Sequence, residues 1–469
     1  MIQFGTGGWR AVIGEDFIMD NIRRVAAGVL ELARQENNTD KPIIVGYDRR
    51  FLSENAARWV AEVLAAGGIT VLFMNRSVPT PLVMHTVKDR ELHYGIEITA
   101  SHNPSNYNGI KLIVEEGRDA PLETTHKLEE IIEGISNVSF ESFDAAVESG
   151  KIVYIKNPFN RFLDDIIAQL DMNALRERGL RVMFDSMHGS GSYPLLVIFH
   201  TARCTIDTIN INKDAYFGGQ MPAPSEQALV MLKNTVVRDS YDMGIAMDGD
   251  GDRLGIIDKS GRYINANEIL CMLYYYLVKY KGWKGPVVRN LATTHMLDKI
   301  AESFGEKCYE VPVGFKYISA KIDEVDAVLG GESSGGLTVR GHIHGKDSVY
   351  AASIFAEMVS VTDKSPSEII DELEAQFGHF DMVEDNLRFE PEMKPAINDI
   401  IMVEKQLPEF SEEIDWVNYE DGCKVYFKNG DFVICRFSGT EPLLRIFAES
   451  SSKEKAAEYI ASFRKFLKL

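Results

Sequence analysis

Hydrophobic and polar positions alternate between two patterns along most of the chain. Short apolar runs rich in β-branched residues occur at 42–48, 69–75, 92–100, 180–186 and 243–248. Amphipathic stretches separate them, such as 53–68, which begins with a serine as a possible helix cap and ends in two glycines. This alternation predicts α/β units with largely parallel sheets.

Several of the apolar runs end in clusters of Gly, Asn or Asp. TASHNPSNYNG begins at the end of the run at 92–100, and DGDGDR begins at the end of the run at 243–248. Ligands bind at the carboxyl ends of strands in open α/β sheets. These two loops are therefore the first candidates for a functional site.

The length of the chain, 469 residues, is too great for one ordinary core and predicts three or four domains. The acidic region 122–149 is predicted to be helical, and so is 365–378. The last ninety or so residues are richer in short strands, with Asn429-Gly430 as a hairpin turn and a closing helix at 452–468. The predicted domains are 1–150, 151–256, 257–375 and 376–469.

Charge and composition exclude several classes of protein. Lys plus Arg number 50 and Asp plus Glu number 70, so the net charge is -20, which disfavours a nucleic-acid or anionic-membrane partner. The longest apolar run, 269–278, is too short to span a bilayer, and no signal-peptide pattern is present, so we expect a cytoplasmic protein. The five cysteines form no CxxC and predict neither disulfides nor a thiolate metal site.

DGDGDR contains three carboxylates, Asp248, Asp250 and Asp252. Carboxylates held about 4 Å apart repel by roughly 4 kcal/mol per pair at an effective dielectric constant of 20, and a bound cation would relieve this. An EF-hand is excluded because its glycine and glutamate positions hold Arg253 and Lys259. Oxygen ligands favour Mg²⁺, with Arg253 as an anion contact, and the alternative is a solvated acidic turn.

TASHNPSNYNG places Ser101 beside His102. A serine hydrolase is disfavoured because the G-x-S-x-G pattern is absent and neighbouring loop residues seldom share one orientation. The loop alone leaves two interpretations open, a nucleophilic serine or a turn formed by Asn103-Pro104 and Asn108-Gly109. A cation that coordinates a phosphate on serine would give this loop and DGDGDR one purpose.

Three further stretches are candidates for ligand binding. CRFSGTEPLLR has the guanidinium, hydroxyl and glycine components of a phosphate cradle, and the apolar run LLRIFAE speaks against the alternative, a helix with a capping box. GGESSGG offers an acceptor and a hydroxyl suited to sugar hydroxyls, or it is only a glycine-rich turn. PVGFKYI and GHIHGKD offer Lys316, His342, His344 and Lys346, or these are solvated loop residues.

Four motifs in a fixed order, TASHNP, DGDGDR, GESSGG and RFSGTEP, resemble those of the α-D-phosphohexomutase family, the phosphoglucomutases and phosphomannomutases. FGTGGWR at the start extends the resemblance over essentially the whole chain. The resemblance implies an α/β fold of four domains around a central cleft. Three domains would be related α/β domains with mixed sheets, and the fourth would be similar to the TATA-binding-protein fold.

The resemblance also implies a role for each motif. Ser101 would be a phosphoserine whose phosphate binds Mg²⁺ together with the three aspartates. Arg253 and His102 would steady this phosphoryl group, Lys111 would be the general acid/base, and Lys346 the second one. The substrate-binding set would be Arg10 near the transferring phosphate, Lys316, Glu332 and Ser334 at the sugar, and Arg436, Ser438, Gly439, Thr440 and Arg445 at the other phosphate.

The implied reaction moves a phosphoryl group between C1 and C6 of a hexose phosphate through glucose 1,6-bisphosphate, in a monomer or homodimer. The GFK and HGKD stretches are most similar to glucose-type phosphoglucomutases. Dual-specificity enzymes have histidines where this chain has Phe315 and Gly336. The alternatives are a phosphomannomutase, a glucose-1,6-bisphosphate synthase, a phosphoglucosamine mutase, whose DGDADR-like loop matches less well, and a non-catalytic phosphosugar-binding protein.

Overall fold

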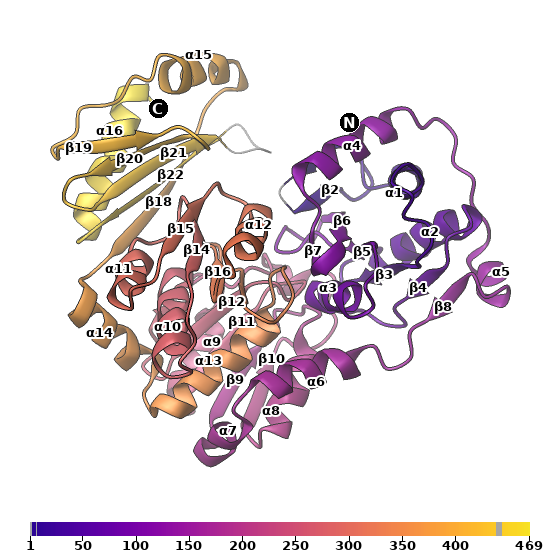
Figure 1. Ribbon diagram of the computed structural model, residues 1–469, viewed down its shortest axis with the longest axis horizontal. Helices are drawn as coiled ribbons and strands as arrows, with labels where there is room; N and C mark the ends of the chain where they lie inside the picture. The colour runs from indigo at the N-terminus through magenta and orange to yellow at the C-terminus, as the bar shows by residue number, and fades with distance from the viewer. Residues whose placement is uncertain (1, 6, 438–442) are drawn as a thin grey trace. The chain divides into compact units, whose positions relative to one another are not determined.

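The computed structural model describes residues 2–5, 7–437 and 443–469 (Figure 1). It divides into two compact units, which are described separately. Unit 1 consists of residues 1–269 and 334–367, and unit 2 consists of residues 270–333 and 368–469. Two helices, α10 (Ala266–Lys279) and α14 (Pro366–Phe377), continue across a boundary between the units.

The first sheet of unit 1 is mixed, with the strand order β1-β2-β6-β5-β3-β4-β8 and β7 paired to β6. β3 is parallel to β4 and β5, whereas β6 is antiparallel to β5 and β2. The strands are β1 (Phe4–Gly5), β2 (Gly8–Val12), β3 (Ile43–Tyr47), β4 (Val71–Phe73), β5 (Tyr94–Ile98), β6 (Tyr107–Val114), β7 (Arg118–Asp119) and β8 (Ile152–Tyr154).

The helices of this part bury their apolar residues against the sheet. One core cluster joins α1, α2, α4 and α5 to the strands, and α3 lies against β3 and β5. β3 and β5 are buried along their whole length, as is typical of continuous apolar strands in a sheet that is covered on both faces. The helices are α1 (Met19–Gln35), α2 (Ser53–Ala66), α3 (Thr80–Asp89), α4 (Leu122–Glu133) and α5 (Phe143–Glu148).

The second sheet of unit 1 has the order β10-β9-β11-β12-β13. β10, β9 and β11 are parallel, and β12 returns antiparallel directly after the DGDGDR loop. Its strands are β9 (Arg181–Asp185), β10 (Thr205–Ile209), β11 (Met243–Met247), β12 (Leu254–Asp258) and β13 (Tyr263–Ile264). Unit 1 also contains α6 (Phe159–Gln169), α7 (Met172–Arg178), α8 (Ser192–Thr201), α9 (Val230–Arg238), β17 (Leu337–Val339) and α13 (Ser348–Thr362).

Unit 2 contains a parallel group of strands and an antiparallel sheet. In the parallel group β14 lies between β15 and β16, and the antiparallel sheet has the order β18-β22-β21-β20-β19. The strands are β14 (Val287–Asn290), β15 (Cys308–Val311), β16 (Leu329–Gly331), β18 (Asp381–Arg388), β19 (Ile414–Asn418), β20 (Cys423–Phe427), β21 (Phe432–Phe437) and β22 (Leu443–Ser450). The helices are α11 (Met296–Ser303), α12 (Phe315–Val325), α15 (Lys394–Asn398) and α16 (Lys453–Leu467).

These elements confirm most of what the apolar pattern predicts. The five predicted strands correspond to β3, β4, β5, β9 and β11, and the closing helix corresponds to α16. The helix predicted over 122–149 is wrong in its middle, because α4 ends at Glu133 and α5 begins at Phe143. The suggestion that Ser53 caps α2 is also wrong, since the cap position is Leu52 and the Ser53 hydroxyl donates to Asp48 instead.

The α/β class with mixed sheets is confirmed, while the domain boundaries and the central cleft stay predictions. The five cysteines are free thiols, as expected, and all but Cys308 are buried. None of the helices in the described ranges is both long and apolar enough to cross a membrane.

A buried ion cluster joins the two sheets of unit 2. The Lys424 ammonium on β20 donates to Glu310 Oε2 on β15 at 2.6 Å and lies 3.1 Å from His295 Nε2. Arg289 on β14 and the hydroxyl of Tyr426 also donate to the Glu310 carboxylate. Lys424 has no exposed side-chain surface, and its removal would take one charged donor from Glu310, which would keep Arg289 and Tyr426.

We expect Lys424→Met to destabilise unit 2 by about 2 kcal/mol, the size of a hydrogen bond to a charged group. The measurement is the urea midpoint followed by tryptophan fluorescence, to which Trp416 contributes, because its ring stacks on Tyr426 with centroids 3.9 Å apart. Lys428→Met is the matched control, because Lys428 pairs with Glu413 at the surface and should shift the midpoint little. Equal midpoints for the two variants would show that the buried cluster does not stabilise unit 2.

Candidate active site

Ser101 lies in the loop between β5 and β6 with a left-handed backbone, φ 52°, and only 1% of its surface exposed. A non-glycine residue in this region costs about 1–3 kcal/mol and persists only where its surroundings impose it. The Ser101 N–H donates to Thr99 Oγ1 at 2.8 Å, so the turn is fixed on its N-terminal side. Arg50 makes further contacts with the backbone of the loop.

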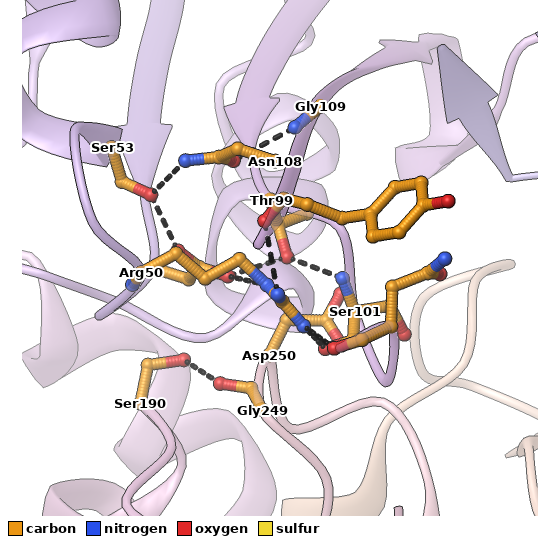
Figure 2. Close-up of polar contacts among 12 residues, drawn as sticks. Arg50, Ser53, Thr99, Ser101, Asn108, Gly109, Ser190, Gly249 and Asp250 are labelled. Atoms are coloured by element: carbon orange, nitrogen blue, oxygen red, sulfur yellow. Dashed lines mark hydrogen bonds and ion pairs between the residues drawn. The ribbon is translucent and has the colours of Figure 1, made fainter. Parts of the chain in front are cut away.

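Arg50 binds four backbone carbonyls of the Ser101 loop (Figure 2). Its Nη2 donates to the carbonyl oxygens of Ser101 and Asn103, both at 2.6 Å. Its Nη1 donates to those of Pro104 at 2.8 Å and Tyr107 at 3.1 Å. The guanidinium is therefore a rigid fork that holds the loop by its backbone and leaves the Ser101 hydroxyl available.

Asp48 completes the support of this loop. Its Oδ1 accepts from the Arg50 N–H at 2.9 Å and from Ser53 Oγ at 2.6 Å, and its Oδ2 accepts from Thr99 Oγ1 at 2.7 Å. Ser53 Oγ also accepts from the Asn108 amide at 2.9 Å (Figure 2). Burial raises the pKa of Asp48, and the nearby Arg50 charge opposes that rise. These buried polar groups satisfy one another, which is what a fixed geometry requires.

The DGDGDR loop connects β11 to β12 and passes close to Ser101. A Cβ on Gly249 would lie 2.7 Å from the Ser101 carbonyl oxygen, so a side chain there would push the two loops apart. Gly251 has φ 71° and occupies the left-handed region that favours glycine. The glycines between the aspartates therefore allow the loop 248–253, called the metal loop below, to approach the loop 99–109, called the serine loop.

The three aspartates converge on one point next to Ser101. Their carboxylate oxygens lie within 4.8 Å of one another, and Ser101 Oγ donates to Asp248 Oδ2 at 3.0 Å. Among the described residues, Asp250 Oδ1 and Asp252 Oδ1 are buried with no hydrogen-bond partner. Buried carboxylate oxygens without a partner, in an all-oxygen set, fit a hard divalent cation such as Mg²⁺.

Two lysines now neutralise part of this negative charge. Lys111 Nζ lies 2.8 Å from both Asp250 Oδ2 and Asp252 Oδ2, and Lys346 Nζ lies 2.9 Å from Asp252 Oδ2. Thr80 Oγ1 donates to Asp250 Oδ2 at 2.7 Å. The alternative that Lys346 is a solvated loop residue is wrong, since Lys346 is only 8% exposed.

The pKa values of these groups follow from burial and from the lysines. Burial and the two neighbouring carboxylates raise the pKa of Asp248 well above its usual value. Burial acts in the same direction on Asp252, but Lys111, Lys346 and Arg253 outweigh it and hold the pKa well below the usual value. Burial lowers the pKa of Lys111, while Asp250 and Asp252 outweigh that effect and raise it overall. As placed, Lys111 is an ammonium ion.

Cationic and neutral donors also lie near Ser101. Arg10 Nη1 donates to the side chain of Asn103 at 2.6 Å, and His102 Nδ1 lies 3.4 Å from Ser101 Oγ. Burial, Arg253 and Arg10 lower the pKa of His102, so the imidazole is neutral near pH 7. Burial and the Arg253 charge also lower the pKa of Arg10. Two guanidinium groups that repel each other are suited to sharing an anion such as a phosphoryl group.

Unit 1 thus contains nine of the predicted residues: seven that the resemblance assigns to the phosphoryl group and its metal, and the two candidate acid/base lysines. They are Ser101, His102, Asp248, Asp250, Asp252, Arg253, Arg10, Lys111 and Lys346. Ser334 also belongs to unit 1. His342, a further candidate, is buried and does not act at the surface, because its Nε2 contacts Asp347 Oδ2 at 2.6 Å.

The other substrate-binding candidates lie in unit 2. Glu332 Oε1 accepts from the Asn290 amide and from the Gly314 N–H, both at 3.1 Å. Gly314 is two residues before Lys316 in the chain. Arg436 and Arg445 are directly opposite each other on β21 and β22, so their side chains share one face of the sheet. Ser438, Gly439 and Thr440 lie outside the described residues. No helix begins at Leu443, where β22 starts, which agrees with the strand prediction.

The sequence interpretation missed the residues that support the site. Arg50, Asp48 and Thr80 hold the serine loop and the metal loop, and Ser190 N donates to the Gly249 carbonyl at 3.0 Å. One signal was available, because the apolar run 42–48 ends in the polar residues Asp48, Arg49 and Arg50 in the same way that the run 92–100 ends in TASHNP. Polar residues at neighbouring parallel strand ends meet at the same edge of a sheet.

Sequence models of all four domains of the phosphoglucomutase/phosphomannomutase family match this chain. The alpha/beta/alpha domains I, II and III match residues 1–139, 160–261 and 265–377, and the C-terminal domain matches residues 384–466. Together these matches cover most of the chain and occur in the order of the family.

Whole proteins of the same family are similar over nearly the full length. A phosphoglucomutase/phosphomannomutase from Thermococcus kodakarensis is 28% identical over 97% of this chain and 96% of its own length. A protein named "Probable phosphoglucosamine mutase" from Methanothermobacter thermautotrophicus is 30% identical over 97% and 95%. The crystal structure of a phosphoglucomutase/phosphomannomutase family protein from Burkholderia thailandensis has the same fold, with a TM-score of 0.83, 22% identity and coverage of 100% and 98%.

The four domain matches and the full-length relatives agree with the serine, aspartate and arginine cluster of unit 1. The chain belongs to the phosphoglucomutase/phosphomannomutase family, the α-D-phosphohexomutases.

Proposed function

We propose that this protein is a Mg²⁺-dependent phosphoglucomutase that interconverts glucose 1-phosphate and glucose 6-phosphate. The proposal rests on the position of Ser101 Oγ, which lies 3.0 Å from Asp248 in the aspartate cluster and 3.4 Å from His102 among the cationic and neutral donors. A phosphoryl group on this oxygen would have carboxylates for a metal and donors for its own oxygens close by. Such positioning and charge neutralisation are what phosphoryl transfer mainly requires.

In the first half-reaction a sugar hydroxyl oxygen attacks the phosphorus of phospho-Ser101. The new O–P bond forms as the P–Oγ bond breaks, Oγ keeps the electron pair, and an acid/base group accepts the hydroxyl proton. In the second half-reaction Ser101 Oγ attacks the other phosphate of the hexose 1,6-bisphosphate. The released sugar oxygen then takes up the proton, so the enzyme returns to its starting state.

Each residue of the site has a role in these steps. Asp248, Asp250 and Asp252 would hold Mg²⁺, which supplies charge neutralisation at the phosphoryl oxygens when bound. Arg10 and Arg253 would bind the same oxygens, and neutral His102 can donate one hydrogen bond. Lys111 is our candidate for the acid/base group, and since it is an ammonium ion between two aspartates, it must lose its own proton before it can act as the base.

Two observations favour glucose as the sugar. The GFK and HGKD stretches are similar to those of glucose-type enzymes, and the metal loop has glycine at 251, where the DGDADR pattern would have alanine. An alanine Cβ there would lie 3.0 Å from Pro79 Cβ on a left-handed backbone. The names of the relatives include both phosphoglucomutase/phosphomannomutase and phosphoglucosamine mutase, so the sugar is the part of the proposal that most needs a test.

Purified protein incubated with glucose 1,6-bisphosphate should contain a fraction heavier by one phosphoryl group. Ser101→Ala should lose this fraction and lower mutase turnover by at least about 10³-fold, as removal of a nucleophile does. Ser190→Ala is the matched control, because its hydroxyl contacts the Gly249 carbonyl and carries no phosphoryl group in this proposal. Intact-mass spectrometry decides the point, and a phosphorylated Ser101→Ala protein would contradict the proposal.

Arg50→Met should reduce both the phosphorylated fraction and kcat, the latter by about 10²-fold, because a small misplacement of a reacting group has an effect of that size. Its four carbonyl partners would lose their donor while the backbone of Ser101 would lose its constraint. Arg49→Met is the control, since Arg49 binds the Ile211 carbonyl and Ser192 and does not contact the serine loop. Full turnover in Arg50→Met would show that the fork is dispensable.

Initial rates with the 1-phosphates of glucose, mannose and glucosamine should rank glucose first, with kcat/KM at least about tenfold above the others. A tenfold ratio corresponds to about 1.4 kcal/mol, the size of one hydrogen bond gained or lost at a sugar hydroxyl. A higher value for mannose or glucosamine would contradict the sugar assignment and leave the mutase proposal intact. Release of free bisphosphate in place of the isomerised product would instead indicate the synthase.

A further inference from the structure

Glu97 is a buried carboxyl group that the proposed reaction does not use. It lies on β5 with no exposed surface, and neither of its carboxylate oxygens has a hydrogen-bond partner among the described residues. Burial raises the pKa of Glu97 well above its usual value, and Asp48 and Asp250 raise it further. An unpartnered buried carboxyl group is unfavourable for the fold, so its presence calls for a reason.

The described residues around Glu97 leave space for its side chain but form no hydrogen bond with its carboxyl group. A Cβ on Gly46 would lie 2.3 Å from Glu97 Oε2, 2.4 Å from Val83 Cγ2 and 3.2 Å from Val78 Cγ2. The carboxyl group therefore occupies the space that this glycine on β3 leaves empty, next to valine methyl groups. Asp48, Asp250 and Lys111 are the charged groups that act on it in the described part of the chain, and Lys111 is the only cation of the three.

Lys111 is the residue directly opposite Glu97 in the sheet. β5 and β6 are antiparallel, and Glu97 and Lys111 are partners in their register. Side chains of directly opposite residues point to the same face of a sheet, with Cβ atoms about 4.5–5.5 Å apart. The long lysine side chain can therefore reach the Glu97 carboxylate by rotation about its own bonds, without movement of either strand.

Lys111 lies next to the site where the metal would bind, because it contacts the Oδ2 oxygens of Asp250 and Asp252, whose Oδ1 oxygens have no hydrogen-bond partner in the ranges that the structure describes. Its ammonium lies 2.8 Å from Asp250 Oδ2 and 2.8 Å from Asp252 Oδ2, and Lys111 is itself 1% exposed. A divalent cation between these carboxylates would repel the ammonium ion at short range. A buried ammonium ion that loses its partners needs another carboxylate nearby.

We infer that Glu97 is a positioning residue for Lys111: when a divalent cation binds the three aspartates, the Glu97 carboxyl group releases its proton to solvent, and the Lys111 ammonium moves from Asp250 and Asp252 to the resulting Glu97 carboxylate. This inference rests on the proposed Mg²⁺ site. The exchange replaces one cation by another at the aspartates and gives the buried glutamate the partner it lacks.

The test is Mg²⁺ binding to the full-length protein by isothermal titration calorimetry, with all variants matched by mass for phosphorylation of Ser101. Glu97→Gln should weaken Mg²⁺ binding by about tenfold, because Lys111 loses a charge-assisted hydrogen bond in the metal-bound state. In a Lys111→Met background the same substitution should change the affinity by less than about twofold. Glu97→Gln should also unfold at the same or a higher temperature without metal, since a buried unpartnered carboxyl group is removed.

Glu357→Gln is the matched control. Glu357 is also fully buried, but it accepts a hydrogen bond from the Asp171 N–H at 2.6 Å. It lies nine residues along α13 from Ser348, whose hydroxyl donates to the Gly251 carbonyl, and this separation corresponds to about 13 Å of helix. Glu357→Gln should lower the unfolding temperature and leave Mg²⁺ affinity unchanged, which is the reverse of the pattern expected for Glu97→Gln.

Three outcomes would overturn the inference. Equal Mg²⁺ affinity in Glu97→Gln and the wild type would show that Lys111 does not depend on Glu97. An equal loss of affinity with and without Lys111 would show that Glu97 acts on the metal directly through its charge. The absence of Mg²⁺ binding by the wild type would overturn the metal proposal itself, and this result is distinguishable from the other two.

Discussion

The contact on which the site depends most is the one between the Arg50 guanidinium and the backbone of the serine loop. Four carbonyl oxygens between Ser101 and Tyr107 accept from one side chain, which Asp48 in turn anchors at its own backbone. This arrangement fixes a left-handed residue that would otherwise relax, and it sets the distance from Ser101 Oγ to the aspartates. Metal binding, phosphate binding and proton transfer all presuppose that distance.

The second constraint on the site is charge balance. Three aspartates, two lysines and two arginines lie close together and are largely buried, so each charge must be neutralised by a neighbour or by a ligand. Lys111 and Lys346 do this for the carboxylates, whereas Arg10 and Arg253 retain a mutual repulsion. In the proposed function, a metal ion would add positive charge at the aspartates, and a phosphoryl group would add negative charge at the two arginines.

Much of this could be predicted from the sequence because the signals are local. Apolar runs that end in polar clusters locate β5 and β11, and the motifs at 99–109 and 248–253 identify the serine and the three aspartates. The role of Arg50 could not be predicted, since its partners are backbone carbonyls, which any sequence provides. Glu97 was also missed, because one charged residue within a buried strand interrupts the apolar pattern and says nothing about what lies opposite.

Ser53 illustrates the same limit on a smaller scale. A serine before an apolar periodic stretch is a typical helix cap, and its actual partner, Asp48, becomes apparent only once β3 and α2 are placed together. Tertiary contacts decide between two local interpretations that the sequence leaves equally reasonable.

The way in which Arg50 holds the loop has a consequence for the two states of Ser101. Because every hydrogen bond from the guanidinium to the loop goes to a main-chain oxygen, none of them depends on whether the Ser101 hydroxyl is free or esterified. In the proposed reaction, the same Arg50 contacts would therefore hold the loop whether or not Ser101 is phosphorylated. The loop would not have to change its backbone conformation between the two half-reactions.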